Sequence, residues 1–533
     1  MKQFISTIFV LLLLSTVSIL FAAETVIKLD APDVAEQWKF TEKTGSIQNG
    51  ELVFDGTTNM PKGFFLPLEW NDAKLSAKFM VEPGPDDKVL ACGFIVRAVD
   101  ANHYYYVHFD RRSAILVRAD ESNDWTEITR VAVPNRQSGK WYDASLEVND
   151  DTLTVSFDGK KLYEAKDTSL KGAGRIGFYS RQGIAHVKDI RVDGNAQAAT
   201  AEWNIPTPVE YTVKKIWDIA PHSAFTDITF FHGEFYCTFR EGTGHVPGQK
   251  TGDGDGEIRV IKSKDGETWH SVVLLKKKGY DLRDSKISET PDGRLMLTIG
   301  GSIYIDGRLT ARQPHVSFSD KNGENFSEPQ PIVIDPAIRS DMDWVWRVTW
   351  YNGIGYAVVY QDWQAKNQPW VSGLLKTTDG VHYDLVKKFE VDGMPNEATV
   401  RFDDAGKMFI LLRREGGSSA GGMGTSSAPY TDWTWQETGK RLGGPDFLFL
   451  PNGKILIGSR AYDNGIATAL YRLNPQGQMI EIVRLPSNGD TSYPGFVIHD
   501  EILWVSYYSG HEGKTSIYLA KIPLKEIEKA VEE

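Results

Sequence analysis

The chain has 533 residues, enough for about three domains of ordinary size, or for one ordinary and one large domain. Asp and Glu outnumber Lys and Arg by 71 to 59, and the net charge of −12 argues against a protein that grips nucleic acid or an anionic membrane through a general basic field. The 41% hydrophobic and 24% charged residues are typical of a globular protein. Two cysteines, Cys92 and Cys237, lie in apolar runs, and we expect buried free thiols.

The first 23 residues predict an export signal. Lys2 gives the start a positive charge, and residues 4–23 are almost wholly apolar. These features are the n-region and h-region of a secretory signal, and we expect cleavage near Ala22 and Ala23. The alternative is an uncleaved anchor, because the apolar stretch is close to the length that spans a bilayer. With cleavage, the protein would be secreted or periplasmic, without membrane contact.

Residues 24–195 predict an antiparallel, two-sheet domain. Apolar and polar residues alternate in short runs such as 75–81, 104–109 and 153–157, which Gly, Asn-Asp and Asp-Gly turns separate. About a dozen such strands would fit a jelly-roll sandwich. The segments 94–110 and 141–159 resemble the concanavalin-like (laminin-G-like) domains attached to secreted carbohydrate-active enzymes. Residues 196–208 are small and polar and predict a linker.

Residues 209–526 contain an internal repeat. Trp269, Phe326 and Tyr383 follow one another at intervals of 57 residues, each just after an Asp-Gly or Asn-Gly turn, and Trp435 follows 52 residues later. We interpret these turns as structural. Between them, a pair of apolar strands joined by a turn occurs six times, in residues 226–240, 286–300, 347–361, 397–413, 446–460 and 493–508.

Six hairpins, each with room for two more strands, predict a six-bladed β-propeller of four-stranded blades. Residues 211–217 are the candidate strand that completes the last blade, and residues 527–533 would be a C-terminal tail. The whole chain is therefore predicted to be all-β, a jelly-roll sandwich followed by a six-bladed propeller.

The hairpin ends that meet at one face of the propeller predict a ring of side chains around the central channel. The ring includes Asp284 and Lys286, to which the sequence assigns no role. Charged residues at hairpin ends are often merely solvated. Several arginines on an acidic body nevertheless predict a basic funnel that holds an anionic ligand through guanidinium forks. These arginines are Arg240, Arg283, Arg347, Arg413 and Arg460.

Two segments resemble the bacterial sialidase family, in a divergent branch. Asn396-Glu397-Ala-Thr, followed 16 residues after the glutamate by Arg413, resembles the strand pair that carries the family's activating Glu and one carboxylate-binding Arg. Ser492-Tyr493-Pro-Gly resembles the segment of the tyrosine nucleophile, and the Asp-Gly turns resemble Asp-boxes. The resemblance covers about 210–525. It implies that Tyr493 is the nucleophile, Glu397 its activating partner, and Arg413 and Arg460 two of three carboxylate clamps, with no metal and no cofactor.

The same resemblance places the general acid in the loop after the first hairpin, at Asp255 or Asp253. That Gly-Asp-Gly-Asp-Gly run would also suit a flexible turn or a calcium loop. The segment 225–228 lacks the family's first arginine. Either Arg240, Arg283 or Arg347 supplies the missing fork, or the pocket has changed and the substrate is another acidic sugar or none.

Three functions follow as hypotheses. The leading one is a secreted exo-acting glycoside hydrolase of sialidase type, whose partner is a glycan with a terminal carboxylated sugar. A carboxylate nucleophile would be repelled there, so a Tyr activated by Glu attacks instead. The second is a lyase or hydrolase on uronate-containing polysaccharide, which His245 and His511 in Gly-flanked loops suggest. The third is a glycan-binding protein without catalysis. A contact from Tyr493 to Glu397 favours the first, and one to His245 favours the second.

Overall fold

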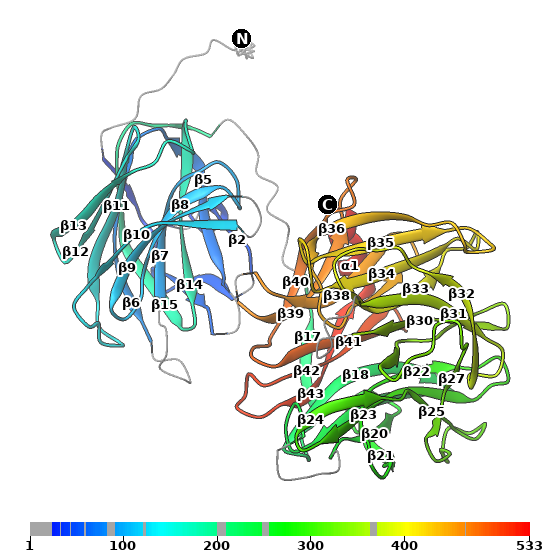
Figure 1. The fold of residues 1–533 in the computed structure, drawn as a ribbon. Helices are drawn as coiled ribbons and strands as arrows, with labels where there is room; N and C mark the ends of the chain where they lie inside the picture. Colours follow the sequence, from blue (N-terminus) through cyan, green and yellow to red (C-terminus); the bar gives the residue numbers. More distant parts are fainter. Residues whose placement is uncertain are drawn as a thin grey trace, which may run out of the picture. The chain divides into compact units, whose positions relative to one another are not determined.

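The computed structural model describes residues 24–31, 34–42, 44–57, 60–82, 91–120, 124–199, 209–247, 255–362, 370–463 and 465–532. The predicted export signal, Asp253 and most of the predicted linker lie outside these ranges. Within them, no helix is long and apolar enough to cross a membrane. The chain divides into two compact units, residues 1–205 and 206–533, and both are built almost wholly from strands (Figure 1).

The first unit consists of two antiparallel sheets. The first has the order β13 (Lys160–Lys166), β12 (Thr152–Phe157), β11 (Tyr142–Asn149), β6 (Ala73–Val81), β15 (Ile184–Asp193), β4 (Glu51–Asp55), β3 (Gly45–Gln48), with β1 (Glu24–Ile27) paired to β15. The second has the order β10 (Asp124–Ala132), β9 (Ser113–Asp120), β8 (Tyr104–Phe109), β7 (Ala91–Ala98), β14 (Gly174–Arg181), β5 (Lys62–Trp70), β16 (Ala196–Ala198), with β2 (Trp38–Phe40) paired to β5 and a 3-10 turn η1 (Ala35–Gln37) before β2.

One hydrophobic core joins the two sheets. Alternate residues of β6 are buried, as period-two alternation predicts, and Phe79 of β6 contacts Phe94 of β7 with ring centroids 5.8 Å apart. Both cysteines are free and buried, as expected. Because β16 pairs with β5, the first residues of the predicted linker belong to this unit. The jelly-roll and concanavalin-like assignments stay predictions.

The second unit contains six sheets arranged as the six blades of a propeller. Blade 1 is β18 (His222–Phe231), β19 (Glu234–Gly242), β20 (Glu257–Ser263) and β21 (His270–Leu275). Blade 2 is β22 (Asp281–Glu289), β23 (Leu295–Ile305), β25 (His315–Phe318) and β26 (Gln330–Pro331), with β24 (Arg308–Arg312) on β23. Blade 3 is β28 (Asp343–Val345) and β29 (Thr349–Tyr351) on β30 (Ile354–Gln361), then β31 (Val371–Thr377), β32 (His382–Lys388) and β27 (Val333–Ile334).

The other three blades follow in chain order. Blade 4 is β33 (Pro395–Phe402), β34 (Met408–Arg414), β35 (Ala420–Ser426) and β36 (Thr434–Arg441). Blade 5 is β37 (Asp446–Phe449), β38 (Ile455–Ala461), β39 (Ala467–Leu473) and β40 (Met479–Leu485). Blade 6 is β41 (Thr491–His499), β42 (Ile502–Ser509), β43 (Ser516–Pro523) and β17 (Thr212–Trp217).

The prediction of a six-bladed propeller is confirmed, including the strand that closes the ring of blades. All six predicted hairpins pair as expected, and β17 pairs with β43, so the first strand of the unit completes the last blade. The predicted tail is not separate from this body. Helix α1 (Leu524–Glu532) buries Leu524, Ile527 and Val531 against the core of the last blades.

The Asp-Gly turns are structural. Oδ1 of Asp265 accepts hydrogen bonds from the backbone N–H groups of Glu267 and Thr268 at 2.8 and 2.9 Å. Asp379 does the same for Val381 and His382, both at 2.8 Å. These carboxylates hold their own turns.

The first inner strand is interrupted at corresponding places in four blades. The antiparallel register shifts between Ala224 and Asp227 in β18, and equivalent shifts occur in β22, β33 and β41. Such a bulge leaves residues outside the ladder and redirects their side chains. The residues released in this way include Phe225, Asp284, Glu397 and Tyr493.

Candidate active site

The released side chains Asp284, Glu397 and Tyr493 meet at one cavity of about 960 Å³. Tyr493 has a positive φ of 52° and Asp284 one of 51°, a conformation that non-glycine residues rarely adopt. Such strained backbone is typical of functional sites, where the surrounding structure holds it in place. The bulges therefore deliver chemistry-bearing residues from blades 2, 4 and 6 to a single space.

Tyr493 and Glu397 form the centre of this site. The Tyr493 hydroxyl donates a hydrogen bond of 2.5 Å to Oε1 of Glu397. The other oxygen, Oε2, accepts hydrogen bonds from Nη1 of Arg413 at 2.7 Å and from the backbone N–H of Gly444 at 2.8 Å. Both side chains are almost fully buried, so these contacts lie in a medium of low polarity where they are strong.

The protonation states of the pair follow from this environment. Burial raises the pKa of Tyr493 well above its ordinary value, and the Glu397 carboxylate adds to the rise. Burial also raises the pKa of Glu397, but Arg413 and the hydrogen bonds to the carboxylate outweigh it, so the pKa lies below its ordinary value. At neutral pH the phenol is therefore protonated beside an ionised carboxylate, which is poised to take its proton.

Arg413 connects the pair to a second carboxylate. Its guanidinium contacts Glu397 on one side and forms an ion pair with Glu415 on the other, and Nη1 lies 3.5 Å from the Tyr493 hydroxyl. Glu415 is also paired with Arg441, Oε2 to Nη2, at 2.7 Å. Arg413 is thus fixed in the cavity wall, as the sequence predicted.

Asp284 is the site residue to which the sequence assigned no role. Its Oδ1 is buried without a hydrogen-bond partner, and the residue lines the same cavity as Glu397. Burial raises the pKa of Asp284 to about 6, and the negative charge of Glu397 contributes to the rise, while Arg283 lowers it. A carboxyl group whose pKa is raised toward the working pH is protonated in part in mildly acidic solution and can then act as a general acid.

Asp255, one of the two expected acids, is not among the residues that line the cavity. Its Oδ1 pairs with Nη2 of Arg240 at 3.0 Å, and its other oxygen accepts hydrogen bonds from Thr243. Arg240 itself is fully buried and also pairs with Asp281 at 2.7 Å. Arg240 is therefore a structural residue rather than a substrate clamp, because a buried guanidinium requires its carboxylates inside the fold. Asp253 lies outside the described residues.

Arg347 and Arg460 are also missing from the cavity wall. Arg347 is buried between Asp227, at 2.5 Å, and Asp446, at 3.2 Å. Arg460 donates to the backbone oxygen of Thr491 at 2.8 Å and to the Tyr508 hydroxyl at 3.1 Å. Both arginines have internal partners, and nothing here places them against a substrate.

Arg283 lines the cavity as predicted, and Arg312 is a lining residue that the sequence analysis missed. Arg283 pairs with Oδ2 of Asp281 at 3.0 Å, and Arg312 pairs with Asp362 at 2.5 Å and lies over the Trp344 ring. The described wall holds three arginines and four carboxyl groups, so the expected basic funnel is replaced by a mixed, paired lining. The residues are Arg283, Arg312, Arg413, Asp284, Asp362, Glu397 and Glu415.

The two histidines that raised the lyase alternative have other contacts. His245 lines the cavity but contacts Asp490, with Nδ1 2.7 Å from Oδ2, whereas the bond from the Tyr493 hydroxyl goes to Glu397. His511 lies 2.9 Å from the Ser509 hydroxyl and is not in the cavity lining. The arrangement around Tyr493 is the one expected for activation by a carboxylate.

Comparisons with known proteins agree with this architecture. Residues 28–193 match the model of a family described as a 3-keto-alpha-glucoside-1,2-lyase-like domain. A protein of unknown function from Dyadobacter fermentans is 20% identical with a TM-score of 0.50, over 58% of this chain and 99% of that one. No curated protein matches the chain.

Two glycosidase structures are also similar. One is an α-L-arabinofuranosidase from Fusarium graminearum (14% identity, TM-score 0.47, 59% of this chain and 98% of that one). The other is a mutant sialidase from Trypanosoma rangeli (12% identity, TM-score 0.45, 61% of each chain). Likeness at these identities extends to the fold alone. Residues 28–193 therefore match a 3-keto-glucoside lyase-like family model, and the unit after them is a six-bladed propeller whose cavity is lined by carboxyl groups and tyrosines.

Proposed function

We propose that the propeller unit is a retaining glycoside hydrolase of sialidase type, in which Tyr493 is the nucleophile and Glu397 its base. The observation that carries this proposal is the 2.5 Å hydrogen bond from the Tyr493 hydroxyl to the Glu397 carboxylate at the cavity wall. A neutral phenol is a weak nucleophile, and a carboxylate at hydrogen-bond distance supplies the activation that it needs. With its predicted export signal, the enzyme would act outside the cytoplasm, secreted or in the periplasm.

In the first half-reaction, the Tyr493 oxygen attacks the anomeric carbon while its proton passes to Glu397. The glycosidic C–O bond breaks, and the leaving oxygen takes the proton of the neutral Asp284 carboxyl. The product is a glycosyl–tyrosine intermediate with Glu397 protonated and Asp284 ionised. Arg413, beside Glu397, stabilises the charge that develops on the phenol oxygen.

In the second half-reaction, water attacks the anomeric carbon and gives a proton to Asp284. The bond from the sugar to Tyr493 breaks, and the phenol oxygen recovers its proton from Glu397. Two displacements on the same carbon leave the configuration of the product unchanged. Both carboxyl groups return to their starting states, so the cycle closes.

The substrate class proposed is a glycan with a terminal carboxylated sugar, removed by exo-action. Arg283 and Arg413 line the cavity and retain some exposure, 12% and 15% of their side chains, so each can offer N–H groups to a carboxylate. A tyrosine nucleophile suits such a sugar, because an anionic nucleophile would be repelled by the carboxylate on or near the reacting carbon.

The test is release of 4-methylumbelliferone from its α-sialoside, with absorbance from unsaturated uronates measured in parallel on uronate polymers. We expect sialoside cleavage by the wild type, and none by the Glu397→Gln variant. Tyr383→Phe is the matched control, because the Tyr383 hydroxyl is buried without a partner in blade 3, outside the cavity lining. Absence of glycoside cleavage with production of unsaturated uronate would replace this proposal by the lyase.

One observation favours a second candidate, a hydrolase of neutral glycosides. Each cavity arginine already has a carboxylate partner, and the lining carboxyl groups outnumber the arginines. In that case Glu397 would attack directly, as a carboxylate nucleophile does, with Asp284 as the acid. Cleavage of a neutral aryl α-L-arabinofuranoside that persists in Tyr493→Phe would select this candidate.

A further inference from the structure

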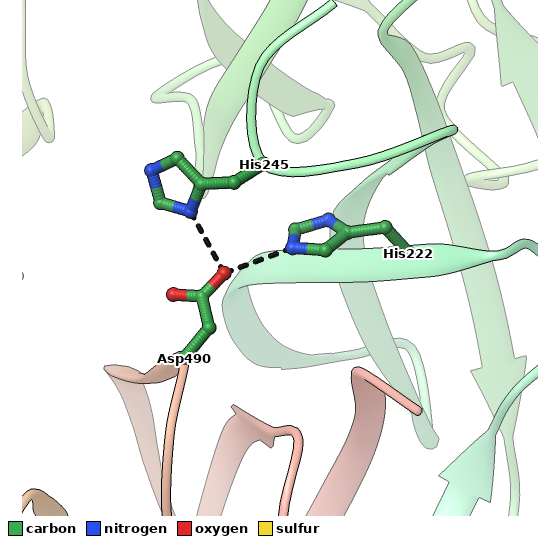
Figure 2. A group of neighbouring side chains, drawn as sticks. All are labelled: His222, His245 and Asp490. Atoms are coloured by element: carbon green, nitrogen blue, oxygen red, sulfur yellow. Dashed lines mark hydrogen bonds and ion pairs between the residues drawn. The ribbon is translucent and has the colours of Figure 1, made fainter. Parts of the chain in front are cut away.

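We propose that His222, His245 and Asp490 bind a divalent transition-metal ion at the rim of the candidate active site, with Zn²⁺ as the type ion. The three residues come from separate segments, His222 from the start of β18, His245 from the loop after β19, and Asp490 from the residue before β41. Figure 2 shows both imidazole rings directed at one oxygen of the carboxylate. This inference goes beyond the glycosidase proposal and does not depend on it.

The geometry is that of a ligand set. Nε2 of His222 lies 2.9 Å from Oδ2 of Asp490, and Nδ1 of His245 lies 2.7 Å from the same oxygen. All three atoms lie within 4.8 Å of one another. Ligands at about 2.0–2.2 Å from one zinc ion are separated by about 3–4 Å, so small movements would place an ion between them.

The carboxylate is held by a second contact, as metal-binding carboxylates are. The buried Tyr508 hydroxyl donates a hydrogen bond of 3.0 Å to Oδ1 of Asp490, which orients Oδ2 toward the histidines. Nη2 of Arg460 lies 3.8 Å from Oδ1 of Asp490 and donates to the Tyr508 hydroxyl. The guanidinium is therefore next to Oδ1 and not next to Oδ2, the oxygen proposed as the metal ligand.

The surroundings leave coordination positions open. His222 is buried and anchored in the ladder of blade 1, whereas the side chain of His245 is half exposed and lines the cavity. Phe225 packs against both His245 and Tyr493, with ring centroids 5.2 and 5.1 Å apart. An ion here would therefore be one aromatic ring away from the proposed nucleophile, with its free positions available to water or to sugar hydroxyls.

Two imidazoles and one carboxylate select the metal class. Imidazole nitrogen suits Zn²⁺ and its first-row neighbours, whereas Ca²⁺ and Mg²⁺ prefer sites made wholly of oxygen ligands. No metal was expected, and the sequence spacing does not point to this site. The two histidines are 23 residues apart, Asp490 lies 245 residues after the second, and the three form no motif. Only the closure of the ring between blades 1 and 6 brings them together.

The test uses the full chain without a histidine tag, dialysed against a chelator and then titrated with Zn²⁺ in competition with a chromogenic chelator. We expect one Zn²⁺ per chain and no comparable binding of Ca²⁺. Asp490→Asn and His245→Gln should each weaken binding at least 100-fold. Tyr508→Phe should weaken it about 10- to 100-fold, the usual effect of removing a contact that orients a ligand. Because no substrate is present, the result is independent of any glycosidase activity.

His382→Gln is the matched control. His382 also hydrogen-bonds a carboxylate, Asp379, with Nδ1 to Oδ2 at 2.8 Å, but among the described residues it belongs to no group of three potential metal ligands. Its loss should leave Zn²⁺ binding unchanged. His245 is half exposed, so its replacement should not disturb folding, and circular dichroism of each variant checks this point. Failure of the wild type to bind one equivalent, or equal binding by wild type, Asp490→Asn and His245→Gln, would overturn the proposal.

Discussion

The Tyr493 hydroxyl and the Glu397 carboxylate, 96 residues apart in the chain, are joined by a hydrogen bond of 2.5 Å. One residue comes from the bulge of β41 in blade 6 and the other from the bulge of β33 in blade 4. The contact therefore depends on the propeller as a whole, because neither blade could position the pair alone. It links a strained backbone to a proton acceptor, which is what nucleophile activation requires.

The first prediction concerns the loss in free energy of unfolding that results from ionising the buried Asp284 carboxyl. Its pKa is raised from 3.8 to about 6, so this carboxyl contributes most to stability below pH 4, and its contribution is lost as the pH rises through 6. At about 1.4 kcal/mol per pKa unit, Asp284→Asn should raise the free energy of unfolding by about 2–3 kcal/mol at pH 7.5. Denaturant unfolding at pH 4 and 7.5 measures the difference.

The same variant separates function from stability. Asp284→Asn should lose at least 100-fold in kcat on a natural glycan and much less on an aryl glycoside, whose leaving group needs little protonation. A pH-independent change in stability, or full activity on the glycan, would remove Asp284 from the role of general acid.

The second prediction concerns Arg413. Arg413→Lys keeps the charge but cannot contact Glu397, Glu415 and a substrate carboxylate together, because an ammonium lacks the planar fork. We expect a loss of about 2–4 kcal/mol of transition-state stabilisation, or about 30- to 1,000-fold in kcat/KM. Steady-state kinetics on the aryl sialoside checks this value, and near-wild-type kinetics would show that Arg413 does not engage the substrate.

The third prediction concerns Asp255, which the structure pairs with Arg240. Asp255→Asn should leave kcat within about twofold of wild type, because the residue is paired with Arg240 and does not line the cavity. Stability should fall, since Arg240 is fully buried and would keep only Asp281 as an anionic partner. Thermal unfolding and kinetics of the same preparation distinguish the two effects. A loss of activity without a loss of stability would restore Asp255 as a catalytic candidate.

The fourth prediction is that residues 206–533 fold alone. This unit has its own hydrophobic clusters, and the strand that closes its ring, β17, lies within it. Expressed without the first unit, it should unfold cooperatively and keep the activity of the full chain on a small aryl glycoside. Insoluble or molten material would show that the first unit is needed for the propeller to fold.

The sequence predicted the architecture because the repeat is local. Alternation of apolar and polar residues indicates each strand, and the 57-residue spacing of Trp269, Phe326 and Tyr383 indicates successive blades. Together they predict which strands pair as hairpins. Glu397, Arg413 and Tyr493 were found because each belongs to a segment with a distinctive local pattern.

The rest of the site could not be predicted, because it depends on which charged side chains pair with one another. The spacing of residues in the sequence does not encode those pairs. Arg240 ends its hairpin as Arg413 does, and Arg347 begins one. Each is nevertheless paired inside the fold with two aspartates from other segments of the chain. Asp284 was on the predicted ring, but the sequence does not show that it lies in the bulge of β22 with Oδ1 buried and without a hydrogen-bond partner.

The most direct test of the account is kcat of Tyr493→Phe on the best aryl glycoside, with Tyr383→Phe as control. If Tyr493 is the nucleophile, kcat should fall by several orders of magnitude while the melting curve is retained, and a fluorinated sialosyl reagent should label the wild type at Tyr493. A Tyr493→Phe enzyme that keeps more than about a tenth of wild-type kcat, a change of only about 1.4 kcal/mol in the barrier, would contradict the proposed mechanism.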